Sequence, residues 1–289
     1  MTTLTQHRVR LPLRLPLSGL THRDAVLLQG PEGGGEWSPL LGFPSDPAVC
    51  RHAAEEAATV PWPSAVRDQV RVNALVPAVA PDEAAALAQG WADVKVKVGD
   101  AEDVDRVAAV RDAIGTHARL RVDANGAWDV DTAVERIARL APFDLELAEQ
   151  PVVSLEDLAT VRRRTTVPVA ADECVRDVND ARRLAALDAA DALVVKVQPL
   201  GGIAMAIEVA EAAGVAVIVS SMYETSVGLA FGLALAAALD ELPFACGLGT
   251  AGLFTGDVVA DPLLPVDGWL TVRRPVPEPG LLARYEAVG

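Results

Sequence analysis

Residues 93–123 read DVKVKVGDAEDVDRVAAVRDAIGTHARLRVD and contain one complete unit of the fold. The valine-rich run Asp93–Val98 predicts a β-strand, and the alanine-rich stretch 101–115, which opens with acids and closes at a glycine, predicts a helix. A second run, Leu120–Asp123, follows within a few residues. Strand, helix and strand in this order predict two parallel strands joined by a crossover helix.

The same alternation continues on both sides of this unit. It predicts strands at Val70–Leu75, Asp93–Val98, Leu120–Asp123, Leu145–Glu149, Val167–Asp172, Ala192–Val197, Val215–Ser220 and Phe244–Leu248. Helices are expected near 82–90, 101–115, 131–140, 154–164, 178–188, 202–213 and 226–239. Eight such units favour an α/β fold with a closed (β/α)8-type barrel over residues 71–267. An open doubly wound sheet is the alternative, but no Rossmann-type glycine fingerprint follows the first run.

Residues 1–70 follow another pattern. Arg8–Pro16 and Asp24–Gln29 predict strands, and Asp46–Ala58 predicts a helix. Gly30–Gly35 is expected to be a loose turn that does not bind phosphate, because no helix follows it. These elements predict a small α+β domain. The tail 268–289 contributes one more strand, Trp269–Val272, and is expected to pack back on that domain.

Composition excludes several classes of protein. The chain has 289 residues, 51% of them hydrophobic, and a net charge of −15, which argues against binding to nucleic acid or to anionic membranes. Its long uncharged run 225–239 is too short to span a bilayer and predicts a buried helix. The N-terminus does not resemble a secretory signal, and three widely spaced cysteines favour a reducing compartment. We therefore expect a cytoplasmic protein; the sequence leaves its oligomeric state open.

Lysine is rare and is concentrated in the predicted barrel. Of 25 basic residues only Lys95, Lys97 and Lys196 are lysines, and all three lie in predicted strands. Arginine cannot release its proton at a workable pH, whereas a buried lysine can act as a base. The competing interpretation is that codon usage favours arginine and that these lysines are remnants.

Charged residues also end five consecutive predicted strands. Lys97, Asp123, Glu149, Asp172 and Lys196 follow one another at intervals of one β/α module. Barrel enzymes carry their chemistry at this end of the strands, so the five side chains are expected to converge. The competing interpretation is that each acid only caps the next helix.

The alternation of side chains along a strand predicts which neighbours of these residues face the barrel interior. Lys95 shares a face with Lys97, and Arg121 shares one with Asp123, whereas Glu146 and Glu173 should point away from the barrel axis. Three converging carboxylates would repel one another unless a divalent cation binds them. Without histidine or cysteine ligands, Mg²⁺ is favoured over Zn²⁺. A cation and the Lys95 ammonium nearby should lower the pKa of Lys97, which makes it a candidate general base for removing a proton α to a carboxylate.

The motifs VKVKVG (94–99), RVDANG (121–126), EQP (149–151), ADE (171–173) and VKV (195–197) together resemble the enolase superfamily, in particular its muconate-lactonizing subgroup. The resemblance implies that Asp123, Glu149 and Asp172 bind Mg²⁺. It also implies that Lys97 is the acid/base, that Lys196 is its counterpart on the other face, and that Lys95 modulates Lys97. Residues 1–70, with the tail, would be the capping domain. All four histidines precede the third predicted strand, which disfavours the arrangement that uses a histidine base.

Within the subgroup the chain is most similar to the short, actinobacterial-type o-succinylbenzoate synthases, because the part before the barrel is short. These Mg²⁺-dependent lyases eliminate water from a small carboxylate substrate during menaquinone synthesis. The alternatives are an N-acylamino acid racemase or a dipeptide epimerase, and a non-catalytic metal-binding relative. The Asp-x-Asp pair typical of dipeptide epimerases is absent after the eighth predicted strand. Candidate substrate-binding residues are Arg121, Asn125, Ser220, Ser221, Gly249, Thr250 and Arg23 of the 18–23 loop.

Overall fold

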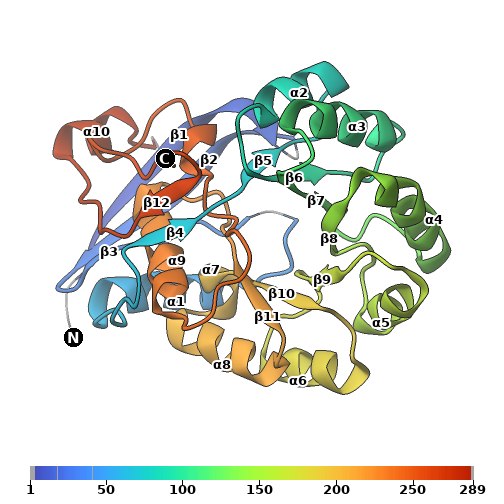
Figure 1. Ribbon diagram of the computed structural model, residues 1–289. Helices are drawn as coiled ribbons and strands as arrows, with labels where there is room; N and C mark the ends of the chain where they lie inside the picture. Colours follow the sequence, from blue (N-terminus) through green and yellow to red (C-terminus); the bar gives the residue numbers. More distant parts are fainter. Residues whose placement is uncertain (1–3, 18, 41, 288–289) are drawn as a thin grey trace.

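The computed structural model describes residues 4–17, 19–40 and 42–287 (Figure 1). An antiparallel sheet of β1 (Thr5–Leu17), β2 (Leu20–Gly30) and β3 (Gly33–Trp37) opens the chain, and α1 (Pro47–Thr59) packs against it. In β1, alternate residues Val9, Leu11 and Leu13 are buried, as expected for a sheet with one covered face. Asp46 caps α1 by accepting a hydrogen bond from the Ala48 amide, and Pro47 begins the helix.

The predicted turn Gly30–Gly35 is partly wrong, because Gly33–Trp37 form β3. A Cβ on Gly35 would lie 1.9 Å from the Ala54 carbonyl oxygen of α1. The glycine is therefore needed for close packing of the helix on the sheet, a reason that a sequence pattern does not distinguish from a flexible turn.

A curved parallel sheet forms the main body of the protein, with strand order β11-β10-β9-β8-β7-β6-β5. Its strands are β5 (Ala74–Val76), β6 (Asp93–Lys97), β7 (Arg119–Asp123), β8 (Leu145–Glu149), β9 (Val169–Ala171), β10 (Ala192–Val195) and β11 (Ala216–Val219). The connecting helices are α2 (Pro81–Ala88), α3 (Asp103–Ile114), α4 (Val130–Leu140), α5 (Leu155–Arg164), α6 (Val178–Leu187), α7 (Val197–Leu200), α8 (Ile203–Ala213) and α9 (Ser226–Ala238). Figure 1 shows these helices around the outside of the sheet. Short 3₁₀ turns η1 (Ala141–Phe143) and η2 (Ala251–Leu253) complete the connections.

The predicted eighth strand, Phe244–Leu248, is not a regular strand. Cys246 makes a parallel bridge to Val72, and Gly247 makes one to Ser220. The segment therefore joins the two edges of the curved sheet with only two bridged positions. The predicted run Val70–Leu75 also divides into β4 (Gln69–Arg71) and β5, because β4 pairs antiparallel with β12 (Trp269–Thr271) rather than with the parallel sheet.

The end of the chain returns to the N-terminal sheet. After α10 (Pro279–Arg284), the Arg10 amide donates to the Tyr285 carbonyl, and the Ala287 amide donates to the Arg8 carbonyl. Residues 285–287 thus lie beside β1, whereas the tail strand β12 pairs with the start of the barrel. No helix among the described residues is both long enough and apolar enough to cross a membrane.

Candidate active site

A cavity of about 790 Å³ lies at the carboxyl ends of the parallel strands. Four of the five residues in the predicted series of strand ends, Lys97, Asp123, Asp172 and Lys196, line it together with Lys95, whereas Glu149 is not among the lining residues. Its other wall comes from the loop between β3 and α1, through Leu40, Gly42, Phe43 and Pro44. The N-terminal domain therefore contributes to the cavity through this loop. The predicted 18–23 loop does not line the cavity with any residue that the structure describes, and Ser18 lies outside the described residues.

Asp123 is at the centre of one group of charges. Its Oδ2 lies 2.6 Å from the Lys97 Nζ and 3.0 Å from the Lys95 Nζ. Lys95 also donates to the Glu149 Oε1 at 2.5 Å. Both carboxylates are 1% exposed. β6, β7 and β8 are adjacent and in register, with Lys97 opposite Asp123 and Asp123 opposite Glu149, which explains how the pattern of strand ends brings these groups together.

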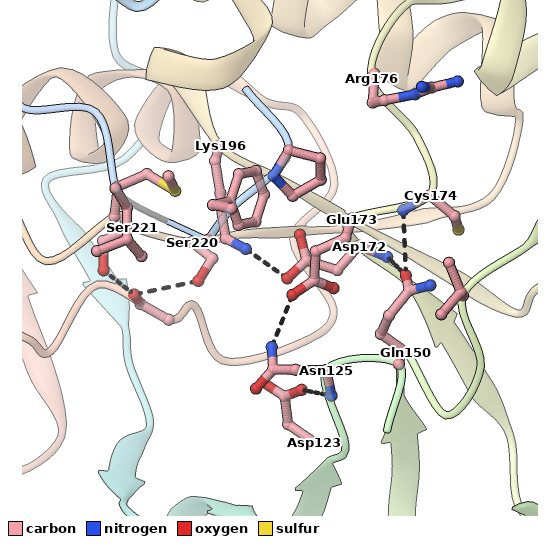
Figure 2. Close-up of a pocket in the computed structure, with 18 of the residues that line it drawn as sticks. Asp123, Asn125, Gln150, Asp172, Glu173, Cys174, Arg176, Lys196, Ser220 and Ser221 are labelled. Atoms are coloured by element: carbon pink, nitrogen blue, oxygen red, sulfur yellow. Dashed lines mark hydrogen bonds and ion pairs between the residues drawn. The ribbon is translucent and has the colours of Figure 1, made fainter. Parts of the chain in front are cut away.

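Lys196 forms the opposite side of the site. Its Nζ donates to the Asp172 Oδ2, and the ammonium lies 4.4 Å from the centre of the Phe43 ring. Figure 2 shows Lys196 and Asp172 on the side away from Asp123. An aromatic face attracts a cation by about 0.5–2 kcal/mol, so Phe43 helps to hold this ammonium in place. No sequence pattern predicts this contact, because Phe43 lies in an irregular loop of the other domain.

The buried charges shift one another strongly. Burial and the neighbouring Asp123 carboxylate raise the pKa of Glu149 to about 8. Burial would raise the pKa of Asp123 too, but the ammonium groups of Lys95 and Lys97 outweigh it and hold that pKa well below its usual range. Burial lowers the pKa of Lys95 and of Lys196, and the surrounding carboxylates outweigh it and raise both.

In the protein chain alone the pKa of Lys97 is raised, whereas the prediction was that it would fall. Burial does lower this pKa, but the Asp123 carboxylate outweighs burial and leaves it raised. The prediction assumed that a bound cation would be the nearest charge, whereas here the nearest charge is a carboxylate.

The donor set of the site fits a hard divalent cation. Asp123, Glu149 and Asp172 supply buried carboxylate oxygens from three adjacent strands, and oxygen is the ligand that Mg²⁺ prefers. Burial, together with the nearby Asp123 carboxylate, disfavours the ionised form of Glu149, and a bound cation would offset this effect. In the described residues the carboxylates pair with lysines, and no group of three or more His, Cys, Asp or Glu side chains is gathered closely enough to hold a metal ion.

Two polar residues beside the carboxylates on the cavity wall were missed or misplaced by the sequence predictions. The Gln150 Oε1 accepts a hydrogen bond from the Asp172 amide at 2.7 Å and so links the loops after β8 and β9. Glu173, predicted to point away from the barrel axis, instead lines the cavity and accepts from the Asn125 Nδ2 at 2.7 Å (Figure 2). β9 ends at Ala171, so the alternation of side chains no longer applies two residues later.

Among the candidate substrate-binding residues, Asn125, Ser220, Ser221 and Thr250 line the cavity. The Ser221 hydroxyl donates to the Gly247 carbonyl at 2.8 Å and lies 3.0 Å from the Thr250 hydroxyl. These hydroxyls give the wall after β11 a neutral, hydrogen-bonding character. Gly249 does not line the cavity: a Cβ there would lie 3.0 Å from the Asn73 carbonyl oxygen, so its role is close packing.

Arg121 and Arg23 are also placed outside the cavity. Arg121 is buried within the barrel, where it donates to Glu146 at 2.5 Å and to the Ala245 carbonyl at 2.7 Å. Arg23 is 6% exposed and donates to the carbonyls of Ser38, Pro39, Met222 and Tyr223. It therefore ties the cavity loop of the N-terminal domain to the loop after β11, and its donors are occupied by backbone rather than directed at a ligand.

Comparison with known proteins agrees with the motifs. Residues 79–285 match the family described as "Enolase C-terminal domain-like", and residues 8–58 match the family described as "Enolase N-terminal domain-like". The chain belongs to the enolase superfamily.

This enolase-superfamily member has relatives over most of its length. It is 52% identical over 279 residues to a Thermobifida fusca protein named o-succinylbenzoate synthase, covering 94% of this chain and 88% of that one. It is 45% identical over 291 residues to a protein of the same name from Mycolicibacterium smegmatis, covering 97% and 89%. The solved muconate lactonizing enzyme of Pseudomonas fluorescens has a TM-score of 0.88 at 21% identity, covering 99% and 98%, and this confirms the predicted fold class.

Proposed function

We propose that this protein is an o-succinylbenzoate synthase, which dehydrates 2-succinyl-6-hydroxy-2,4-cyclohexadiene-1-carboxylate to 2-succinylbenzoate in menaquinone synthesis. The observation that carries the proposal is the 52% identity to a synthase over 94% of the chain, combined with a cavity lined by the predicted lysines. Lyases of this kind work on soluble metabolites. The proposal therefore places the protein in the cytoplasm, in line with its three free cysteines.

The proposal includes one Mg²⁺ as the resident cofactor, held by Asp123, Glu149 and Asp172. When bound, such a cation stabilises the negative charge that develops on a substrate carboxylate as its α-proton leaves. The environment of Glu149 supports this assignment. Burial and the neighbouring Asp123 carboxylate raise the pKa of Glu149 to about 8, and a cation bound beside it would oppose both effects and favour the ionised form that binds a metal.

Lys97 is proposed to move the proton. Its Nζ lies at the cavity wall, and its side chain is 20% exposed. As a free amine it would accept the proton from C1 of the ring, next to the carboxylate. The electron pair of the C1–H bond then forms the C1=C6 double bond, the C6–O bond breaks, and the hydroxide leaves as water with the proton that Lys97 carries. The lysine returns to its starting state, and atoms and charges balance.

Lys196 is proposed to support the reaction as a fixed cation on the other face of the ring. Lys196 is 9% exposed, and its ammonium is held between Asp172 and the Phe43 ring. Lys95, which bridges Asp123 and Glu149, would position both carboxylates and modulate Lys97. The hydroxyls of Ser220, Ser221 and Thr250 line the wall proposed to face the remote part of the substrate, and they would donate to a small carboxylate by rotating away from their present partners.

Two lysines on opposite sides would also permit α-proton exchange without elimination, as in a racemase or epimerase. A substrate panel separates these functions: the purified protein with Mg²⁺ is assayed with the cyclohexadiene carboxylate, with N-acylamino acids and with dipeptides. The proposal expects formation of the aromatic product, followed by its ultraviolet absorbance, at a kcat/KM far above that for the amino-acid derivatives. A higher kcat/KM for racemisation would replace it with the alternative. The absence of both dehydration and solvent deuterium exchange would favour a non-catalytic relative.

A further inference from the structure

A chain of hydrogen bonds runs behind Lys97 and ends at a residue that the proposed reaction does not use. The Lys97 Nζ donates to the Asn125 Oδ1 at 2.6 Å, and the Asn125 Nδ2 donates to the Glu173 Oε1 at 2.7 Å. Figure 2 shows the Asn125 amide reaching across to Glu173. Asn125 and Glu173 belong to the loops after β7 and β9, so the chain of bonds connects the two strands that flank β8.

The backbone holds Asn125 in the position from which it can make both bonds. Its φ angle is +46°, in the left-handed region that asparagine tolerates better than most residues. Its amide donates to the Asp123 Oδ1 at 3.0 Å, and the next amide, of Gly126, donates to the Gln150 carbonyl at 2.7 Å. The remaining freedom is rotation of the side-chain amide, and Glu173 sets that rotation: a carboxylate accepts only from the NH₂ group, so the amide oxygen must face Lys97.

This arrangement fixes the direction in which Lys97 exchanges a proton. An amine nitrogen has three positions besides its bond to carbon, and acceptors at Asp123 and Asn125 occupy two of them. The third is left for the substrate. If the Asn125 amide turned over, its NH₂ would face the Lys97 nitrogen and that acceptor would be lost.

We infer that Glu173 and Asn125 are positioning residues for Lys97: Glu173 orients the Asn125 amide, and the amide oxygen aims the lysine nitrogen at the substrate. This inference rests on the proposed function. Glu173 is half-buried, and its second oxygen, Oε2, is buried and has no hydrogen-bond partner in the part of the chain that the structure describes. One oxygen therefore carries the whole observed contact, and the acceptor rather than the charge is the feature that matters.

The test compares two substitutions at one position. Glu173→Gln keeps an oxygen that accepts from Asn125 and removes the charge, whereas Glu173→Ala removes both. We expect Glu173→Ala to lower kcat and the rate of solvent deuterium exchange at the α-carbon by roughly 10- to 100-fold, the range that misplacement of a catalytic group by about 1 Å costs. KM should change by less than about 3-fold, and Glu173→Gln should recover most of the lost kcat. Asp131→Ala is the control, because it removes a carboxylate that is 87% exposed in an ion pair between α4 and α5.

The outcomes are distinguishable. Equal loss in the Gln and Ala variants would mean that the charge of Glu173 is what counts, and the inference would be overturned. Unchanged kcat in both variants would also overturn it while leaving the synthase assignment intact. Asn125→Asp adds a second measurement: it still offers an acceptor to Lys97 but cannot donate to Glu173, so replacing Glu173 by Ala in that background should cause little further loss. Lack of dehydration by the unaltered protein would instead refute the proposed function.

Discussion

Replacing Arg23 by Met tests whether this residue binds substrate, as the sequence suggested, or holds two loops together, as the structure shows. The guanidinium donates to the Ser38 carbonyl at 2.5 Å and to the Met222 carbonyl at 3.1 Å, and more weakly to the Pro39 and Tyr223 carbonyls at 3.4 and 3.3 Å. Methionine keeps much of the buried volume and removes every donor.

The expected loss of stability follows from the two shorter hydrogen bonds, to the carbonyls of Ser38 and Met222. A hydrogen bond from a charged donor contributes about 1.5 kcal/mol at the lower end of its range, so losing two costs about 3 kcal/mol. At roughly 2 °C per kcal/mol for a large domain, the melting temperature should fall by about 6 °C. Separation of the two loops should also raise KM, because both contribute walls of the cavity.

The assay is thermal unfolding followed by circular dichroism, with KM measured on the same preparations. Arg10→Met is the control, since Arg10 lies on the adjacent strand of the same sheet in an exposed ion pair with Asp24, and its loss should leave the melting temperature nearly unchanged. A large rise in KM with an unaltered melting temperature for Arg23→Met would refute the structural role and restore the hypothesis that Arg23 pairs with a substrate carboxylate.

Four further outcomes are expected. Lys97→Arg should abolish dehydration and deuterium exchange, a loss of at least the ~10²–10⁴-fold that general-base catalysis contributes, and residual exchange would move the base to the other side of the site. Lys196→Arg should retain more synthase activity than Lys196→Ala, because a supporting cation survives, and the reverse order would contradict the supporting role. Glu149→Gln should weaken Mg²⁺ binding at least tenfold in calorimetry without lowering the melting temperature at pH 8, since burial already disfavours its ionised form there. Burial and the nearby Glu224 raise the pKa of Glu36 from 4.5 to about 7, so between these pH values the folded state keeps a proton that the unfolded chain has released. The free energy of unfolding should therefore fall as the pH rises from 4.5 to 7. Glu36→Gln should reduce this fall when the melting temperature is measured as a function of pH.

The parts of the fold that the sequence predicted well are those with a local cause. Each β/α unit has its own apolar strand, capping residues and turn, so helices such as α4 and α9 begin and end within a residue or two of their predicted bounds. The segment Phe244–Leu248 differs because closing the sheet requires Cys246 to meet Val72, a residue far away in the chain. Its composition resembles a strand whether or not its partners are in register.

The site was predictable where it depends on strand ends and was not where it depends on contacts between domains. The series from Lys97 to Lys196 needs only the module spacing and the register of adjacent strands. Phe43 lies above Lys196 because a loop of the N-terminal domain folds over the barrel, and Arg23 is buried because it meets carbonyls about 200 residues away. No local pattern encodes either contact, so an arginine near the predicted cavity was mistaken for a ligand-binding group.

Depth along a strand, as well as the face of the strand, decides which inward side chains reach the cavity. Arg121 points to the same side as Asp123 but lies two residues earlier, which is roughly 6.6 Å deeper at the usual rise of a strand. At that depth the barrel interior is a packed layer of Leu147, Ala170, Ala192, Val194 and Ile218, and Arg121 lies in the interior against the Phe244 ring at 5.3 Å. Lys95 occupies the equivalent deeper position on β6, yet it reaches Asp123 and Glu149 because its side chain is long and extends upward. An inward position therefore predicts a functional contact only when the strand is about to end or when the side chain can span the missing distance.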